Sequence, residues 1–240
     1  MNSNKNGEIS IEKSSLFNAR VAGIFYFTFL ITAGFSQLVR NNLIIPNNIA
    51  VTVSNIITHN LLYRISFVTD LIGSTSYIFL IFFLYKLLKS VNKNIAKLMV
   101  ILVLIGIPIA MLNQLNQFAP LLLLSGADYL KVFDTNQINS LIMLFLDFYK
   151  HGVYIADIFW GSWLIPFGYL VYKSKFLPRI LGILLMAGSS GFLIESFVMT
   201  LIPDYQILTY PGLAIGTIAE LSTIFWLLIR GINVSKIEKN

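Results

Sequence analysis

Four acidic residues lie within long apolar stretches of the sequence, and their carboxyl groups are the clearest candidates for chemistry. They are Asp70, Asp157, Glu195 and Glu220. A charge at the centre of an isolated membrane helix costs about 2.5–3.5 kcal/mol, so four charged acids facing lipid would cost on the order of 10 kcal/mol. We therefore expect them to face a bundle interior or a wet cavity, or to be protonated. Carboxyl groups so placed bind protons or cations, or they hold helices together by hydrogen bonds, and both alternatives are open.

A second group of polar residues precedes Asp157 on one face of a predicted helix. Lys150 and His151 follow Asp147 by three and four residues, the spacing of neighbours on a helix. Asp147 can pair with Lys150 or His151 at the outer membrane interface. Alternatively, the group acts as a proton relay or, together with His59, as a metal site. Because the two histidines lack the spacing of metal ligands and the chain has no cysteine, we predict no metal site.

The composition indicates what kind of protein holds these residues. Of the 240 residues, 56% are hydrophobic and only 12% are charged, whereas about 25% of an average soluble domain is charged. Too few polar side chains are present to cover a water-soluble globule, so we predict an integral protein of the lipid bilayer. The same argument excludes a nucleic-acid-binding protein, despite the net charge of +6. No Walker A, GxSxG or HExxH motif is present, and we predict no cofactor.

Six apolar stretches are long enough to cross a membrane core of about 30 Å as helices that rise about 1.5 Å per residue. They cover residues 21–39, 65–88, 96–117, 152–172, 178–201 and 211–229. We therefore predict an all-α fold, an integral membrane bundle of six transmembrane helices. The predicted membrane domain covers residues 21–230, with a tail at 1–20 and another at 231–240.

Lysine and arginine residues gather on one side of the predicted membrane domain. Thirteen of the 17 lie in the two tails and in the second-to-third and fourth-to-fifth connections. The other four are Arg40, Arg64, Lys131 and Lys150. Because short connections rich in Lys and Arg stay in the cytoplasm, we predict that the N and C termini are both cytoplasmic. Arg64 is the arginine expected near the outer mouth, so we expect no transport site built on buried basic residues.

The four acids agree in their depth within this topology. Each lies in the outer half of its span or near the middle of it, and the third span adds amide side chains at its outer end. We therefore predict a polar pocket that faces away from the cytoplasm. Its predicted members are Asp70, Asp157, Glu195, Glu220, Asn113 and Gln117.

Glycines stand one helical turn from each acid and indicate where helices pack closely. Gly191 precedes Glu195 in the fifth span, and Gly216 precedes Glu220 in the sixth as part of a GxxxG pattern. Residues four apart share a helix face, and small residues there let two backbones approach. We therefore expect the fifth and sixth helices to pack tightly and to share a polar site.

Two connections on the outer side are predicted to be helical. Between residues 46 and 63, apolar and polar residues alternate at helical spacing. This pattern indicates an amphipathic helix that lies at the membrane surface or covers the end of the bundle, and Asn47 or Asn48 could cap it. An ordered loop is the alternative there. Residues 134–150 are predicted to form a helix continuous with the fourth span.

Several short stretches resemble a known family. They are ARVAGIFY at 19–26, LIIPNN at 43–48, Asn55-Ile56, Asp70-Leu71, FWG at 159–161, IPFGYLVYKS at 165–174 and LPRILG at 177–182. In this order they resemble the multi-pass membrane proteins grouped as domain-of-unknown-function family 4386. The resemblance covers nearly the whole chain and is most specific between residues 159 and 182. It implies a six-helix domain in the plasma (inner) membrane of a bacterium, and it supplies no activity and no catalytic residue.

Three classes of function are compatible with these residues. The first is a small transporter or a carrier coupled to protons or cations, in which the acids bind the coupling ion or a small solute. The second is a non-catalytic sensor or accessory subunit, in which the acids are structural. The third is an intramembrane lipid-modifying enzyme that uses the acids and His151 in acid–base steps. No pattern identifies a catalytic centre, so no catalytic residue is predicted.

Overall fold

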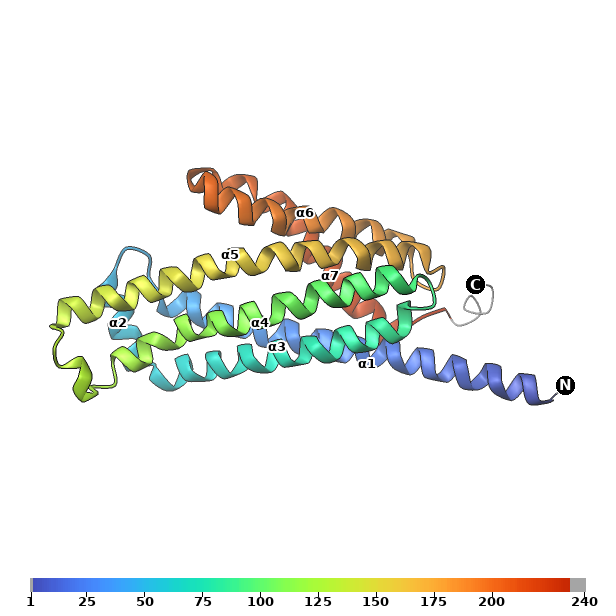
Figure 1. Ribbon diagram of the computed structural model, residues 1–240, viewed down its shortest axis with the longest axis horizontal. Helices are drawn as coiled ribbons and strands as arrows, with labels where there is room; N and C mark the ends of the chain where they lie inside the picture. Colours follow the sequence, from blue (N-terminus) through green and yellow to red (C-terminus); the bar gives the residue numbers. More distant parts are fainter. Residues whose placement is uncertain (1, 234–240) are drawn as a thin grey trace. The chain divides into compact units, whose positions relative to one another are not determined.

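Helices form the regular structure in the computed structural model of this protein, which describes residues 2–233 and the side chains from residue 14 onward (Figure 1). The elements are α1 (Asn2–Leu43), α2 (Ile49–Thr58), α3 (Asn60–Leu88), α4 (Lys93–Leu123), a 3₁₀ turn (Asp128–Leu130), α5 (Thr135–Lys173), α6 (Arg179–Leu201), a second 3₁₀ turn (Pro203–Leu208), α7 (Tyr210–Phe225) and a π-helical turn (Trp226–Arg230). Six of these helices have the length and composition to cross a membrane. The prediction of an all-α fold with six such helices is therefore confirmed.

The long helices extend beyond most of the predicted spans. α1 continues to Leu43, past the predicted end at residue 39, and it begins at Asn2, within the predicted N-terminal tail. α5 runs for 39 residues, so the prediction that residues 134–150 continue into the fourth span is confirmed. Residues 234–240, most of the predicted C-terminal tail, lie outside the described residues.

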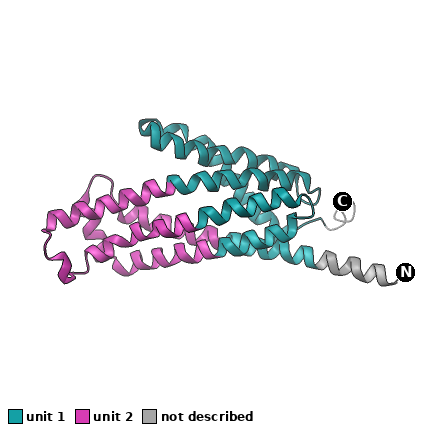
Figure 2. Ribbon diagram, in the orientation of Figure 1, with its two compact units in different colours: residues 1–27, 76–107, 154–240 teal, residues 28–75, 108–153 magenta. Residues whose placement is uncertain are grey.

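The chain is divided into two compact units, and α1, α3, α4 and α5 contribute residues to both (Figure 2). Unit 1 consists of residues 1–27, 76–107 and 154–240, and unit 2 consists of residues 28–75 and 108–153. All of α6 and α7 belongs to unit 1, whereas α2 and the connection between α4 and α5 belong to unit 2.

The core of unit 2 forms where the short helix α2 packs against α1, α3 and α4. Its buried members are Val39, Leu43, Ile56, Tyr63 and Leu121. Asn48 caps the start of α2, because its side chain accepts a hydrogen bond from the Val51 backbone nitrogen at 3.2 Å. Thr52, on the same buried face as Ile56, bonds to the Ile45 backbone nitrogen at 2.9 Å. The predicted amphipathic helix and its Asn48 cap are therefore confirmed, and the alternative of an ordered loop is wrong.

In unit 1, α6 packs against α7 through glycines. A Cβ atom added at Gly188 would lie 2.9 Å from the Gly216 backbone nitrogen, and one added at Gly191 would overlap the backbone of Gly212. Real Cβ atoms essentially never approach other heavy atoms closer than 3.0 Å. The two helix backbones are therefore in direct contact, and the predicted tight packing of the fifth and sixth membrane helices is confirmed.

A second set of small residues brings α6 against α5. A Cβ atom at Gly168 would lie 2.6 Å from the Gly182 carbonyl oxygen, and one at Gly161 would lie 2.9 Å from the Ser189 carbonyl oxygen. On each helix the two positions are about two turns apart and share a face. α6 is thus held between α5 and α7 by contacts that leave no room for a side chain.

We predict that Gly191→Ala lowers the free energy of unfolding by about 1–3 kcal/mol, because the new methyl group overpacks the α6–α7 contact. Gly34→Ala in α1 is the matched control, since a Cβ atom there has no other heavy atom within 4 Å. It should raise the free energy of unfolding by up to about 1 kcal/mol, the usual cost of glycine inside a helix. Titration with SDS in mixed micelles measures both values, and equal effects would contradict the close contact.

Candidate functional site

A buried ion pair joins α1 to α3 in unit 2. The guanidinium group of Arg40 contacts the carboxylate of Asp70, and only 10% and 8% of the two side chains is exposed. The hydroxyl group of Ser36, one turn before Arg40, donates to Asp70 Oδ2 at 2.7 Å and accepts from Arg40. A buried charge is tolerated only when it is paired and hydrogen-bonded. Each of the two charges therefore allows the other to lie between the helices.

Two more helices complete the surroundings of Arg40. The side-chain carbonyl of Gln117 on α4 accepts from Arg40 Nη1 at 3.2 Å, and Gln37 on α1 accepts from Nη2 at 2.9 Å. The centroid of the Tyr149 ring on α5 lies 5.2 Å from the guanidinium carbon, a cation–π distance. Arg40 therefore links four helices of unit 2, and it brings together two predicted site residues, Asp70 and Gln117.

Arg40, rather than Arg64, is the buried arginine, and it takes part in an ion pair between helices. The expectation that no transport site is built on buried basic residues stays a prediction. Arg64 is exposed, and its Nε donates to Asn60 on its own helix at 2.7 Å. The predicted first span ended just before Arg40 because a charge disfavours the membrane core. The helix continues past Arg40 to Leu43, and Asp70 compensates the charge. Ser36 and Gln37, four and three residues before Arg40, were local signals for a polar helix face.

The other predicted amide, Asn113, joins α4 to α5 in unit 2. Its Nδ2 donates to the backbone carbonyl of Tyr149 at 2.8 Å. Its side chain fills the space that a Cβ atom at Gly152 would occupy. Gln117 is fully buried, and its backbone carbonyl accepts from the Tyr63 hydroxyl at 2.7 Å. Both amides therefore hold α4 against its neighbours.

Two acids of unit 1 lie on α5 and α6. Asp157 of α5 is 4% exposed, and Glu195 of α6 is half-buried. The Glu195 carboxyl group is near enough to act electrostatically on Asp157, and both acids act on the Tyr154 hydroxyl, one turn before Asp157. Gly161, one turn after Asp157, is a point of close contact with α6. Within the described residues, neither carboxyl group has a basic nitrogen within 4.0 Å.

Glu220 of α7 is hydrogen-bonded to an aromatic cluster of unit 1. Its Oε1 accepts from the hydroxyl of Tyr26 on α1 at 2.6 Å. The Tyr26 ring packs edge-on against Tyr77 of α3 and Trp163 of α5, at centroid distances of 6.0 and 6.4 Å. All three aromatic residues are buried. The hydrogen-bond partner of Glu220 thus lies on α1, although α7 packs tightly against α6.

The polar stripe that precedes Asp157 on α5 is a surface feature. Asp147, Lys150 and His151 are all exposed, and His151 Nδ1 lies 2.9 Å from the backbone carbonyl oxygen of Asp147. Among the described residues, Asp147 and Lys150 do not form an ion pair within 4.0 Å. Over the same part of the chain, no three His, Cys, Asp or Glu side chains are grouped as metal ligands. The stripe becomes buried only near Asp157.

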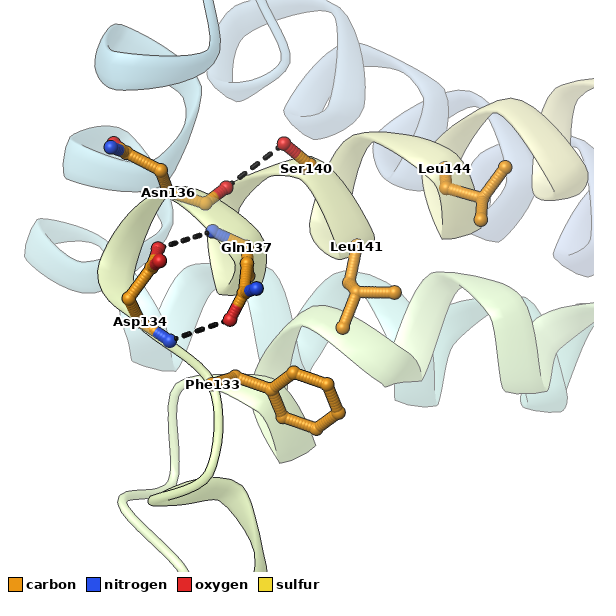
Figure 3. A pocket seen from close by; sticks show the side chains of 7 residues that line it. All are labelled: Phe133, Asp134, Asn136, Gln137, Ser140, Leu141 and Leu144. Atoms are coloured by element: carbon orange, nitrogen blue, oxygen red, sulfur yellow. Dashed lines mark hydrogen bonds between the residues drawn. The ribbon is translucent and has the colours of Figure 1, made fainter.

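An open pocket of about 430 Å³ lies at the beginning of α5 (Figure 3). It is lined by Phe133, Asp134, Asn136, Gln137, Ser140, Leu141 and Leu144. Asp134 and Gln137 exchange two hydrogen bonds of 2.9 Å between side chain and backbone, the capping box that begins a helix. The polar groups of this pocket therefore serve to start α5, and no residue of the predicted polar pocket lines it.

The members of the predicted polar pocket belong to both units. Asp70, Asn113 and Gln117 lie in unit 2, and Asp157, Glu195 and Glu220 lie in unit 1. The sequence patterns did not point to Arg40 and Tyr26, which bond with two of these acids. Tyr26 gave no signal because tyrosine is common in apolar packing and its partner is 194 residues away.

Six long apolar helices with acidic and amide side chains between them define an all-α, multi-pass membrane protein. The chain belongs to the family described as Domain of unknown function (DUF4386), whose model matches residues 21–231. An uncharacterized protein from Archaeoglobus fulgidus is 28% identical over 159 residues, which cover 64% of this chain and 76% of that protein. No solved structure matches the chain. Neither description states an activity, so function is argued from the buried polar groups.

We predict that Asp70→Asn lowers the free energy of unfolding by about 3–5 kcal/mol, because it leaves the Arg40 guanidinium buried without its counter-charge. The double variant Arg40→Met/Asp70→Leu removes both charges and should recover most of this loss. Asp204→Asn, at an exposed acid, is the control and should change stability by less than about 0.5 kcal/mol. SDS titration measures all three. A double variant as unstable as Asp70→Asn would rule out charge pairing as the cause.

Proposed function

We propose that this protein is a carrier of the plasma membrane, coupled to protons or cations, for a small ion or solute. We propose further that the acids of unit 1 bind the coupling ion. The supporting observation is that Asp157, Glu195 and Glu220 have no basic partner within 4.0 Å among the described residues. Asp70, by contrast, is paired with Arg40. The acids thus divide into one that is neutralised by the protein and three that are not.

Asp157 and Glu195 form the centre of the proposed ion site. Two neighbouring carboxylates in a poorly solvated environment repel each other, so a proton or a cation that binds near both lowers their free energy. Asp157 is buried and Glu195 is half-buried. An ion entering from the protein surface therefore meets Glu195 before it meets Asp157.

Glu220 is the second position proposed to hold a proton or a cation. Its hydrogen-bond donor is the neutral hydroxyl of Tyr26, which supplies no counter-charge. A tyrosine hydroxyl can donate to a carboxylate or accept from a protonated carboxyl group. The 2.6 Å bond can therefore persist in both protonation states of Glu220, so α1 and α7 stay connected while the charge changes.

A non-catalytic sensor or accessory subunit is the second candidate function, and the Arg40 network favours it. In that network the acid Asp70 links helices, and the bond between Tyr26 and Glu220 likewise links α1 to α7. If all the acids act in this way, the protein needs no ion. An enzymatic role would require His151, which is exposed and whose ring lies against the backbone of its own helix.

We predict that the protein reconstituted into liposomes dissipates a proton or cation gradient. Asp157→Asn and Glu195→Gln should each lower the rate by about tenfold or more, because each removes one of the two carboxylates proposed to hold the ion. An ion-sensitive dye enclosed in the vesicles measures the rate under gradients of H⁺, Na⁺ and K⁺.

Asp204→Asn, which changes an exposed acid between α6 and α7 in the same way, should match the wild-type rate. Gel filtration and thermal unfolding establish that each variant is folded. The carrier proposal fails if the wild-type protein shows no flux under any of these gradients, or if both variants retain it. That result would favour the accessory subunit, which copurification of a partner would then test.

We also propose that both termini are cytoplasmic, which the distribution of Lys and Arg supports. The chain has no cysteine, so single cysteines can report the side of the membrane. Ser90 lies between α3 and α4, Ser125 lies between α4 and α5, and both are exposed. We predict that a membrane-impermeant maleimide added to intact cells labels Ser125→Cys and leaves Ser90→Cys unlabelled. The reverse pattern would invert the topology.

A further inference from the structure

Two amide side chains of α4 in unit 2 have buried polar atoms without a hydrogen-bond partner. These atoms are Oε1 of Gln114 and Nε2 of Gln117. Gln114 is 7% exposed and Gln117 is 0% exposed. Buried polar atoms in proteins are nearly always hydrogen-bonded, to protein or to ordered water. The two atoms therefore point to a ligand that the amides share.

The orientation of the Gln117 amide is determined by its neighbour. Its Oε1 accepts from Arg40 Nη1 at 3.2 Å, and the opposite orientation would place two N–H donors against the donors of the guanidinium group. Nε2 therefore presents two donor hydrogens on the side away from Arg40. A ligand at this position must accept a hydrogen bond.

Gln114 supplies the complementary group. It precedes Gln117 by three residues, so the two side chains share a helix face, and Cβ atoms with this spacing are about 5–6 Å apart. The amide groups at the ends of two such neighbouring side chains can both reach one small ligand that lies between them. The same ligand can thus accept from Gln117 Nε2 and donate to Gln114 Oε1.

We propose that Gln114 and Gln117 form a binding site for water beside the ion pair of Arg40 and Asp70. Water is the smallest ligand that both accepts and donates hydrogen bonds. A cation does not fit, because Gln117 presents donors. An anion does not fit either, because Asp70 already neutralises Arg40 and Gln114 presents an acceptor. The site does not depend on the carrier function, since it uses residues of the other unit.

Tyr63 is a natural reporter for this water. It is fully buried, and its hydroxyl donates to the backbone carbonyl of Gln117 at 2.7 Å. Hydroxyl radicals generated from bound water by a synchrotron X-ray pulse modify adjacent side chains even when these are buried. We expect mass spectrometry of the wild-type protein to find Tyr63 modified, with the exposed Tyr205 as the internal standard for dose.

Gln114→Met keeps the side-chain volume and removes the acceptor of the bridge. We expect it to lower the ratio of modification at Tyr63 to that at Tyr205 several-fold and to lower the Tm. Leu115→Met, at an exposed position of α4, is the matched control and should change neither. If the site is dry, Gln114→Met removes an unsatisfied buried carbonyl and raises the Tm.

An unchanged modification ratio or a raised Tm in Gln114→Met overturns the proposal. If Gln114→Met does not fold, a cryo-EM map of the wild-type protein that resolves ordered water decides the question. Density for water within about 3.2 Å of Gln117 Nε2 supports the proposal. Continuous density for Gln117 with no such peak overturns it.

Discussion

The interior of a membrane offers almost no solvation to a charge, so the polar groups of a membrane protein must be satisfied by other parts of the chain. In this protein the buried ion pair of Arg40 and Asp70 satisfies two full charges in this way. Because both side chains are buried, α1 and α3 can pack only with these two residues facing each other. Gln117 of α4 and Tyr149 of α5 are placed around the same guanidinium group. Four helices of unit 2 are thus arranged around one buried charge.

Unit 1 meets the same constraint without opposite charges. Close backbone contacts at glycines bring α5, α6 and α7 together, and the acids of these helices have neutral or acidic neighbours instead of basic ones. A carboxylate paired with a guanidinium group already has its counter-charge, whereas these acids do not. This contrast is the physical basis for proposing that ions bind in unit 1 and that Asp70 is structural.

The fold was readable from the sequence because its signals are local. The length of the apolar stretches, the Asn48 cap and the glycines that precede Glu195 and Glu220 each lie within a few turns of one helix. The partners of the acids were not readable, because Arg40 is 30 residues from Asp70 and Tyr26 is 194 residues from Glu220. Which helix faces meet is decided by packing across the whole chain, and no spacing rule within one helix encodes it. The charge of Arg40 even suggested that the first membrane helix ends before this residue, whereas α1 continues to Leu43.

The glycine contacts on two faces of α6 also limit how this helix can move. If α6 turned about its own axis, side chains bearing a β-carbon would enter contacts in which only backbone fits. Packed interiors resist such insertions strongly. Sliding of α6 along its axis would move these glycines out of register and cause the same collision, whereas movement of α5, α6 and α7 together leaves the contacts intact. Glu195 would then keep both its angular position and its height relative to α5 and α7 through any such rearrangement of unit 1.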